Sequence, residues 1–242
     1  MTKRVLAAFL FALLAMAPAF AQEKTPTADQ ILEKFYQAIG GKPAFEKINS
    51  RVQKGTFELP SMGMSGSFEG YAKAPNKNYV VISLEGFGEV KQGYTGTEAW
   101  SLNPMEGLKV MTGEELEVAK READFYNTIR IKEHFTKLEV KGTEKVGDKS
   151  AYVILATPAK GAPEKYYFDT QSGLLIRNDS ERKTEQGLLH VELLLEDYKD
   201  VDGVKIPFTL KQSNEAMSFV IKLSEIKHNV PVDDAKFVRP TS

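Results

Sequence analysis

The chain has 242 residues, with 32 basic and 33 acidic side chains and a formal net charge of −1. This balance argues against strong electrostatic attraction to nucleic acid or to an anionic membrane surface. Because the chain contains no cysteine, disulfides, a thiol nucleophile, a cysteine-ligated zinc site and c-type haem attachment are excluded.

The first 21 residues have the three parts of a secretory signal peptide. Lys3 and Arg4 form a cationic start, Val5–Ala17 is apolar, and Ala19-Phe20-Ala21 is a small-x-small cleavage pattern. We therefore expect cleavage after Ala21, release into the periplasm, and a mature chain of residues 22–242 that forms a single domain. The apolar run is short for a bilayer and no second one follows, so we expect no membrane span after cleavage.

Helical signals come first in the mature chain. Thr27 and Gln30 have the spacing of a capping box, and the apolar residues that follow recur at helical spacing until Gly40-Gly41. Pro43 favours the start of a second, short helix. The sequence thus predicts that helices precede the first strand.

From Ser50 the apolar period changes toward two, which is typical of strands. In Asn78–Glu85, for example, Val80, Ile82 and Leu84 alternate with Tyr79, Val81 and Ser83. The strands predicted in this half are Arg51–Leu59, Gly66–Lys73, Asn78–Glu85, Glu89–Tyr94 and Ala99–Ser101.

A second capping box, Thr112 to Glu115, predicts a helix that runs to about Thr128 across the middle of the chain. Leu116, Ala119, Ala123 and Tyr126 would form its apolar stripe. Further strands are predicted at Leu138–Val146, Lys149–Thr157, Glu164–Asp169, Gly173–Ser180, Leu188–Tyr198, Val204–Gln212 and Ala216–Ile226. The pattern indicates an α+β, mainly β fold: one large curved antiparallel sheet covered by a few helices.

No motif for chemistry stands out. The three histidines, His134, His190 and His228, form no zinc-binding pattern, and Gly63-Met64-Ser65-Gly66 lacks the spacing of a nucleophile elbow. We therefore expect no catalytic residues, no metal and no cofactor.

Apolar side chains gather instead around the first half of the sheet and the middle helix. Methionine adapts to varied apolar shapes, so these residues indicate either ordinary core filling or the lining of an apolar cavity. The candidate ligand-binding residues are Phe57, Met62, Met64, Phe68, Trp100, Phe125 and Tyr126.

The order of these parts resembles the lipoprotein-carrier (LolA/LolB-like) superfamily of exported bacterial proteins. The resemblance implies a half-open β-barrel, closed by a helical lid, whose apolar cavity takes acyl chains. The segments that carry it are Ile31–Gly41, Gly66–Lys77, Tyr166–Arg177, Tyr198–Phe208 and Ile226–Phe237.

The first hypothesis is therefore a non-enzymatic, monomeric periplasmic carrier whose partner is a lipid, a lipoprotein acyl chain or another apolar ligand. The alternative is an envelope sensor or interaction domain that binds another envelope protein. A hydrolase with a dispersed site, built around His134 or His190, is the third hypothesis.

Overall fold

The computed structural model describes residues 25–184 and 187–241, and the predicted signal peptide lies outside these ranges. Strands dominate the described part, as the sequence predicts. The elements are α1 (Ala28–Ala38), α2 (Lys42–Phe45), β1 (Ser50–Leu59), η1 (Pro60–Met62), β2 (Met64–Lys73), β3 (Lys77–Leu84), β4 (Gly88–Tyr94), β5 (Ala99–Asn103), β6 (Gly107–Val110), α3 (Gly113–Ala123), η2 (Asn127–Ile129), α4 (Ile131–His134), β7 (Lys137–Val146), β8 (Lys149–Thr157), β9 (Glu164–Asp169), β10 (Leu175–Thr184), β11 (Gly187–Val201), β12 (Val204–Ser213), β13 (Ser218–His228) and η3 (Asp234–Phe237).

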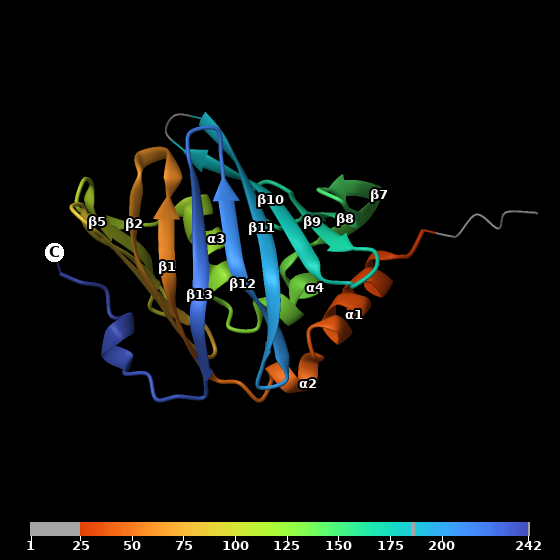
Figure 1. The fold of residues 1–242 in the computed structure, drawn as a ribbon, viewed down its shortest axis with the longest axis horizontal. Helices are drawn as coiled ribbons and strands as arrows, with labels where there is room; N and C mark the ends of the chain where they lie inside the picture. The colour runs from red at the N-terminus through yellow and green to blue at the C-terminus, as the bar shows by residue number, and fades with distance from the viewer. Residues whose placement is uncertain (1–24, 185–186, 242) are drawn as a thin grey trace, which may run out of the picture.

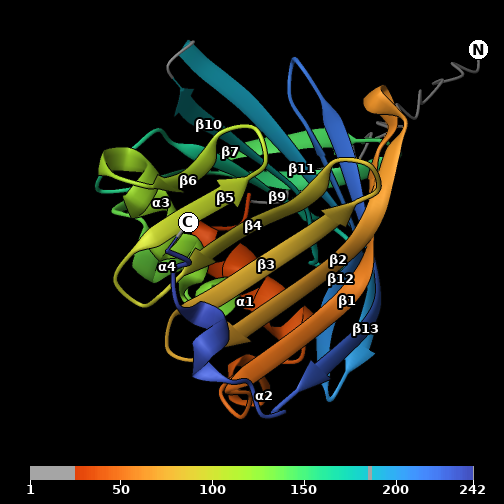
Figure 2. The ribbon, with the colours of Figure 1, turned by 90° about the vertical axis from the view of Figure 1, so that its left-hand side faces the viewer.

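Within the described residues, 13 strands form one antiparallel sheet in the order β6-β5-β4-β3-β2-β1-β13-β12-β11-β10-β9-β8-β7. The sheet is strongly curved and open on one side (Figures 1 and 2). The predicted mainly β, half-open architecture is thereby confirmed.

β1 pairs with β13 and joins the first half of the sheet to the second. Their register shifts between Lys54 and Gly55, which is a β-bulge. A Cβ on Gly55 would lie 2.1 Å from the backbone oxygen of Lys222, so only glycine fits here. The bulge increases the local bend where the two halves of the sheet meet.

The predicted capping box of α1 is present. Thr27 Oγ1 accepts a hydrogen bond from the backbone N–H of Gln30, and Gln30 Oε1 accepts one from the N–H of Thr27. Ile31, Leu32 and Phe35 form its buried stripe, and Phe35 packs 5.2 Å from the ring of Phe168 in β9. α1 therefore anchors to the inner face of the second half of the sheet.

The two edge strands, β6 and β7, follow each other in the chain, so the segment between them must cross from one edge of the sheet to the other. α3, η2 and α4 make this crossing on the concave side (Figures 1 and 2). The main hydrophobic core lies between α1, η2, α4 and the inner face of the sheet, and α3 packs in a separate, smaller cluster.

Two details of the predicted middle helix are wrong. Thr112 occupies the N-cap position of α3, but its side chain makes no capping hydrogen bond, so the predicted capping box is absent. The helix ends at Ala123, because the Asp124 side chain accepts from the N–H of Tyr126 and the N–H of Phe125 turns to the carbonyl of Pro75. Tyr126 therefore does not continue the stripe of Leu116, Ala119 and Ala123. β6 was not predicted.

Candidate functional site

The concave side of the sheet holds two cavities, one on each side of α3. The outer cavity, of about 800 Å³, lies between α3, strands β3–β5 and the β10–β11 hairpin. The inner cavity, of about 400 Å³, is bounded by α1, β1, α4 and strands β9–β12. Glu122 of α3 lines both. Both volumes fall in the ~300–1,000 Å³ range of small-molecule sites.

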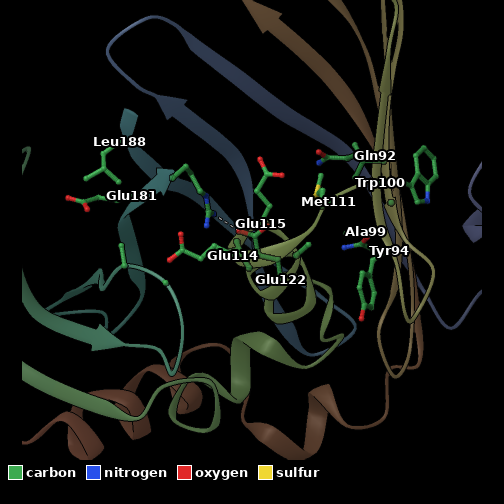
Figure 3. Close-up of a pocket in the computed structure, with 18 of the residues that line it drawn as sticks. Gln92, Tyr94, Ala99, Trp100, Met111, Glu114, Glu115, Glu122, Glu181 and Leu188 are labelled. Carbon is green, nitrogen blue, oxygen red and sulfur yellow. Dashed lines mark hydrogen bonds and ion pairs between the residues drawn. The ribbon is translucent and has the colours of Figure 1, made fainter. Parts of the chain in front are cut away.

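The outer cavity has one apolar wall and one acidic wall. Tyr94, Ala99 and Met111 provide apolar surface from the sheet side, whereas Glu114 and Glu115 of α3 bring carboxylates to the opposite side (Figure 3). At the hairpin, Leu188 also lines this cavity and is 63% exposed. The outer cavity is therefore wide, solvent-facing and acidic on its helical side.

On its inner side, α3 is fastened by a buried ion pair. Arg121 donates to Glu164 of β9, and both side chains are largely buried. The hydroxyl of Tyr166 donates to the other Glu164 oxygen at 2.9 Å, and burial beside this carboxylate raises the pKa of Tyr166 well above its ordinary value. The guanidinium of Arg121 also stacks 5.2 Å from the Phe135 ring. Each charge of the pair thus has several partners.

On its outer side, α3 relies on weaker contacts. Ala119 and Leu116 pack with the buried Ala123 against Tyr94 and Ala99 of the sheet. Glu122 accepts a hydrogen bond from Arg182 of β10 at 2.5 Å, in a more exposed pair. The helix is therefore held firmly to the inner wall and more lightly to the outer one.

The inner cavity is walled mainly by apolar side chains, including Phe35, Leu193, Leu195 and Leu210. Polar side chains line it as well: Arg51 and Gln53 come from β1, Lys205 comes from β12, and the α3 side contributes the charged residues Arg121 and Glu122. The Arg51 guanidinium lies 5.6 Å from the ring centroid of Phe125. Burial lowers the pKa of Arg51 from its ordinary value, because protein encloses the charge.

Across the strand pair, Arg51 is level with His228 of β13. The His228 side chain is 2% exposed, and its Nδ1 lies 3.1 Å from the Asp202 carboxylate. Burial and the positive charge of Arg51 lower the pKa of His228, while Asp202 acts in the opposite direction. His228 is therefore a neutral neighbour of Arg51 near neutral pH.

The structure places most of the predicted ligand-binding residues near the concave core. Phe57 and Phe68 are buried in it, and Met64, Phe125 and Tyr126 pack against it. The hydroxyl of Tyr126 donates to the carbonyl of Ile48 at 3.0 Å. Met62, in η1, is 64% exposed. None of these residues lines the inner or the outer cavity directly.

Trp100 is placed differently. Its backbone borders the outer cavity, but its ring points away from it, to the far side of the sheet (Figure 3). There it packs over Gly93 and lies 6.0 Å from the Tyr79 ring. Trp100 is 1% exposed, so it is a core residue of the outer face.

Sequence reasoning missed the residues that line the inner cavity. A usable signal was present in β1, where side chains alternate between the two faces. Phe57 and Leu59 belong to the concave core, so Arg51 and Gln53, at even spacing from them, share that face. For Leu193 and Leu195, no comparable signal exists, because β11 is apolar on consecutive residues.

The histidines weighed for hydrolysis lie apart. His134 Nε2 is 3.0 Å from Asp124 near the inner cavity, whereas His190 is exposed and pairs with Glu181. In residues 25–184 and 187–241, no group of three or more His, Asp or Glu side chains is placed to hold a metal ion. Across the same residues, no helix combines the length and apolar character needed to cross a membrane.

Comparison with known proteins gives matches to structures only. No family model and no curated protein matches the chain. A DUF1329 family protein from Desulfovibrio piger is similar in fold, with a TM-score of 0.58 and 14% identity over 88% of this chain and 98% of that one.

Two further structures have the same architecture. A LolA superfamily protein from Nitrosomonas europaea has a TM-score of 0.57 and 15% identity, over 89% of this chain and 99% of that one. An outer membrane lipoprotein-sorting protein domain from Vibrio parahaemolyticus has a TM-score of 0.54 and 14% identity, over 87% and 97%. The predicted resemblance is confirmed at the level of the fold, and the chain has a LolA-like fold.

Proposed function

We propose that this chain is an exported carrier, working in the periplasm as a single domain of residues 22–242, that binds a lipid, a lipoprotein acyl chain or another long apolar molecule. The observation that carries the proposal is the pair of cavities under α3, on the concave side of a LolA-like sheet. No chemistry on the ligand is required, and the function is non-enzymatic.

The inner cavity supplies the apolar wall that such a ligand needs. Leu193, Leu195 and Leu210 line it from adjacent strands, and Phe35 lines it from α1. Burying an alkyl chain there contributes about 0.8 kcal/mol per methylene group. A chain of modest length would therefore bind without any covalent link.

The first test asks whether the protein carries a lipid. Protein exported and purified from its own host is analysed by native mass spectrometry, followed by denaturation and lipid extraction. We expect an additional mass that the extraction releases as a lipid.

The second test measures binding directly. Delipidated protein is titrated with the neutral fluorescent probe N-phenylnaphthylamine, and lipids are then added to displace it. We expect saturable fluorescence enhancement and displacement. An empty mass spectrum together with a flat titration would contradict the carrier proposal and favour an interaction domain that binds another envelope protein.

A further inference from the structure

Arg51 lines the inner cavity from near the start of β1, one residue after the strand begins. It precedes Gln53 by two residues on β1, so both side chains project to the concave face, and both line the cavity. The Arg51 side chain is half-buried, its Nε is fully buried, and the Phe125 ring lies beside the guanidinium.

The charge of Arg51 has no counter-ion among the residues that the structure describes. Its Nε is buried without a hydrogen-bond partner, and no ion pair involves its guanidinium. The neighbouring charges on the wall are satisfied in other ways: Arg121 pairs with Glu164, and Glu122 pairs with Arg182. Lys205 also lines the cavity without an ion pair, but it is exposed to solvent. Among the described residues, Arg51 is therefore the cation of the inner cavity that has a buried, unsatisfied donor and lacks a carboxylate.

An enclosed, unpaired guanidinium is unfavourable for the protein without ligand. Desolvation of a charge is costly, and arginine does not escape it by losing its proton as a buried lysine does. The nearby Phe125 ring offsets only part of this cost. Within the described part of the chain, the Gln53 side chain also makes no hydrogen bond. An anionic ligand oxygen placed between the two side chains would satisfy both.

We propose that the inner cavity selects an amphiphile with an anionic head, a carboxylate or a phosphate, which pairs with Arg51 and accepts a hydrogen bond from Gln53. The apolar tail lies against Leu193, Leu195 and Leu210. This inference rests on the proposed carrier function and names its ligand class. The carboxylates of Glu114 and Glu115 make the outer cavity unsuitable for the same head group.

The experiment compares ligands that share a tail and differ in the head. Delipidated protein is loaded with neutral N-phenylnaphthylamine and titrated with myristate, myristyl phosphate or uncharged myristyl alcohol. The two charged ligands are kept below their critical micelle concentrations and the alcohol below its solubility limit. We expect myristate or myristyl phosphate to displace the probe at ~10- to 100-fold lower concentration than the alcohol, the ratio that one charge-assisted hydrogen-bonded pair supplies. The stronger of the two identifies the head group.

Two variants assign the effect to Arg51. Arg51→Gln should bring the charged ligands to the affinity of the alcohol and leave the alcohol unchanged. Lys54→Gln is the matched control: it removes the same charge from the same strand, at an exposed position. It should keep the full preference.

Stability separates a ligand-binding role from a structural one. Without ligand, Arg51→Gln should melt at the same temperature as the parent or higher, because it removes an unpaired buried charge. With myristate, only the parent and Lys54→Gln should gain in melting temperature.

The outcomes are distinct. If all three ligands displace the probe equally, or if Arg51→Gln retains the preference, the anionic-head proposal is wrong while the carrier function stands. If neither the probe nor any ligand binds, the carrier function itself is wrong. If Arg51→Gln does not fold, the head-group comparison on the parent protein still tests the proposal. Gln53→Leu, which removes the second hydrogen-bond donor, should then reduce the preference for the charged ligands.

Discussion

The inner and outer cavities share the helix α3 but differ in size and in the charged side chains that line them. The inner one is smaller, and the unpaired cation Arg51 lines it together with apolar side chains. The outer one is larger, and α3 contributes carboxylates to it. The helix therefore separates two spaces of opposite electrostatic character.

The attachment of α3 differs between its two sides in the same way. Toward the inner cavity, Arg121 and Glu164 form a buried pair that is also bonded to Tyr166. Toward the outer cavity, the contacts are small apolar side chains and the more exposed pair Glu122–Arg182. Moving α3 away from the outer cavity would thus cost less free energy than moving it away from the inner cavity.

Removing the carboxylate of the buried pair should have the largest effect on stability. Glu164→Gln leaves Arg121 charged, buried and without a counter-ion, which costs about 3–5 kcal/mol in the free energy of unfolding. Equilibrium unfolding in urea measures this change. Glu117→Gln breaks the exposed pair with Lys120 on the same helix and should cost at most about 0.5 kcal/mol. Equal midpoints for the two variants would show that the buried Arg121–Glu164 pair contributes no more to stability than an exposed pair on the same helix.

Filling one cavity at a time should show which space holds the tail. Leu193→Trp places an indole in the inner cavity, and Val118→Trp places one in the outer cavity. We expect the inner variant to weaken binding of N-phenylnaphthylamine by at least ~10-fold, equivalent to losing the burial of about two methylene groups. The outer variant should bind like the parent protein. The reverse result would move the site to the outer cavity.

The sequence predicted the sheet well because its strands alternate. The predicted alternation is present in β3, where Val80, Ile82 and Leu84 face the core and Tyr79 stacks with Tyr71 on the other face. The end of α3 was predicted less well. Helical spacing continues through Tyr126, but Asp124 and the carbonyl of Pro75 capture the backbone N–H groups that would extend the helix. Such competition depends on a partner about 50 residues away, which periodicity does not contain.

The candidate site was harder to predict than the fold. Choosing apolar residues identified the core, including Phe57 and Phe68, but a core residue and a cavity residue have the same composition signal. Trp100 illustrates the limit, because its burial comes from Gly93 and Tyr79 on the outer face. Arg51 was overlooked, although its place in the alternation of β1 put it on the concave face.

Acid should destabilise the protein partly through His228, the neighbour of Arg51. Its folded-state pKa lies below the ordinary value of 6.5, so below about pH 6.5 the unfolded chain binds a proton that the folded chain resists. The free energy of unfolding therefore falls as the pH drops from the His228 pKa of the unfolded chain to the lower His228 pKa of the folded chain. His228→Asn should flatten this decline above pH ~5, where most carboxylates remain ionised.

The same measurement connects His228 to the inner cavity. Arg51→Gln removes a positive charge that lowers the His228 pKa, so it should also reduce the acid sensitivity, though by less than His228→Asn. Urea unfolding at a series of pH values gives both slopes. His190→Asn, at an exposed position, serves as the control and should leave the slope unchanged. A decline that is identical in all four proteins would place the acid-sensitive group elsewhere.

The smallest expected effect is at the outer attachment of α3. Glu122→Gln breaks the pair with Arg182, whose side chains are 57% and 33% exposed, so it should cost only about 0.2–1 kcal/mol. Hydrogen exchange of the α3 amides distinguishes this change from loss of the inner pair. In Glu122→Gln the amides should remain nearly as protected as in the parent, whereas in Glu164→Gln they should exchange much faster. If Glu122→Gln releases α3 as fully as Glu164→Gln does, then the helix is held by both walls together, and the outer cavity has no easier route to open than the inner one.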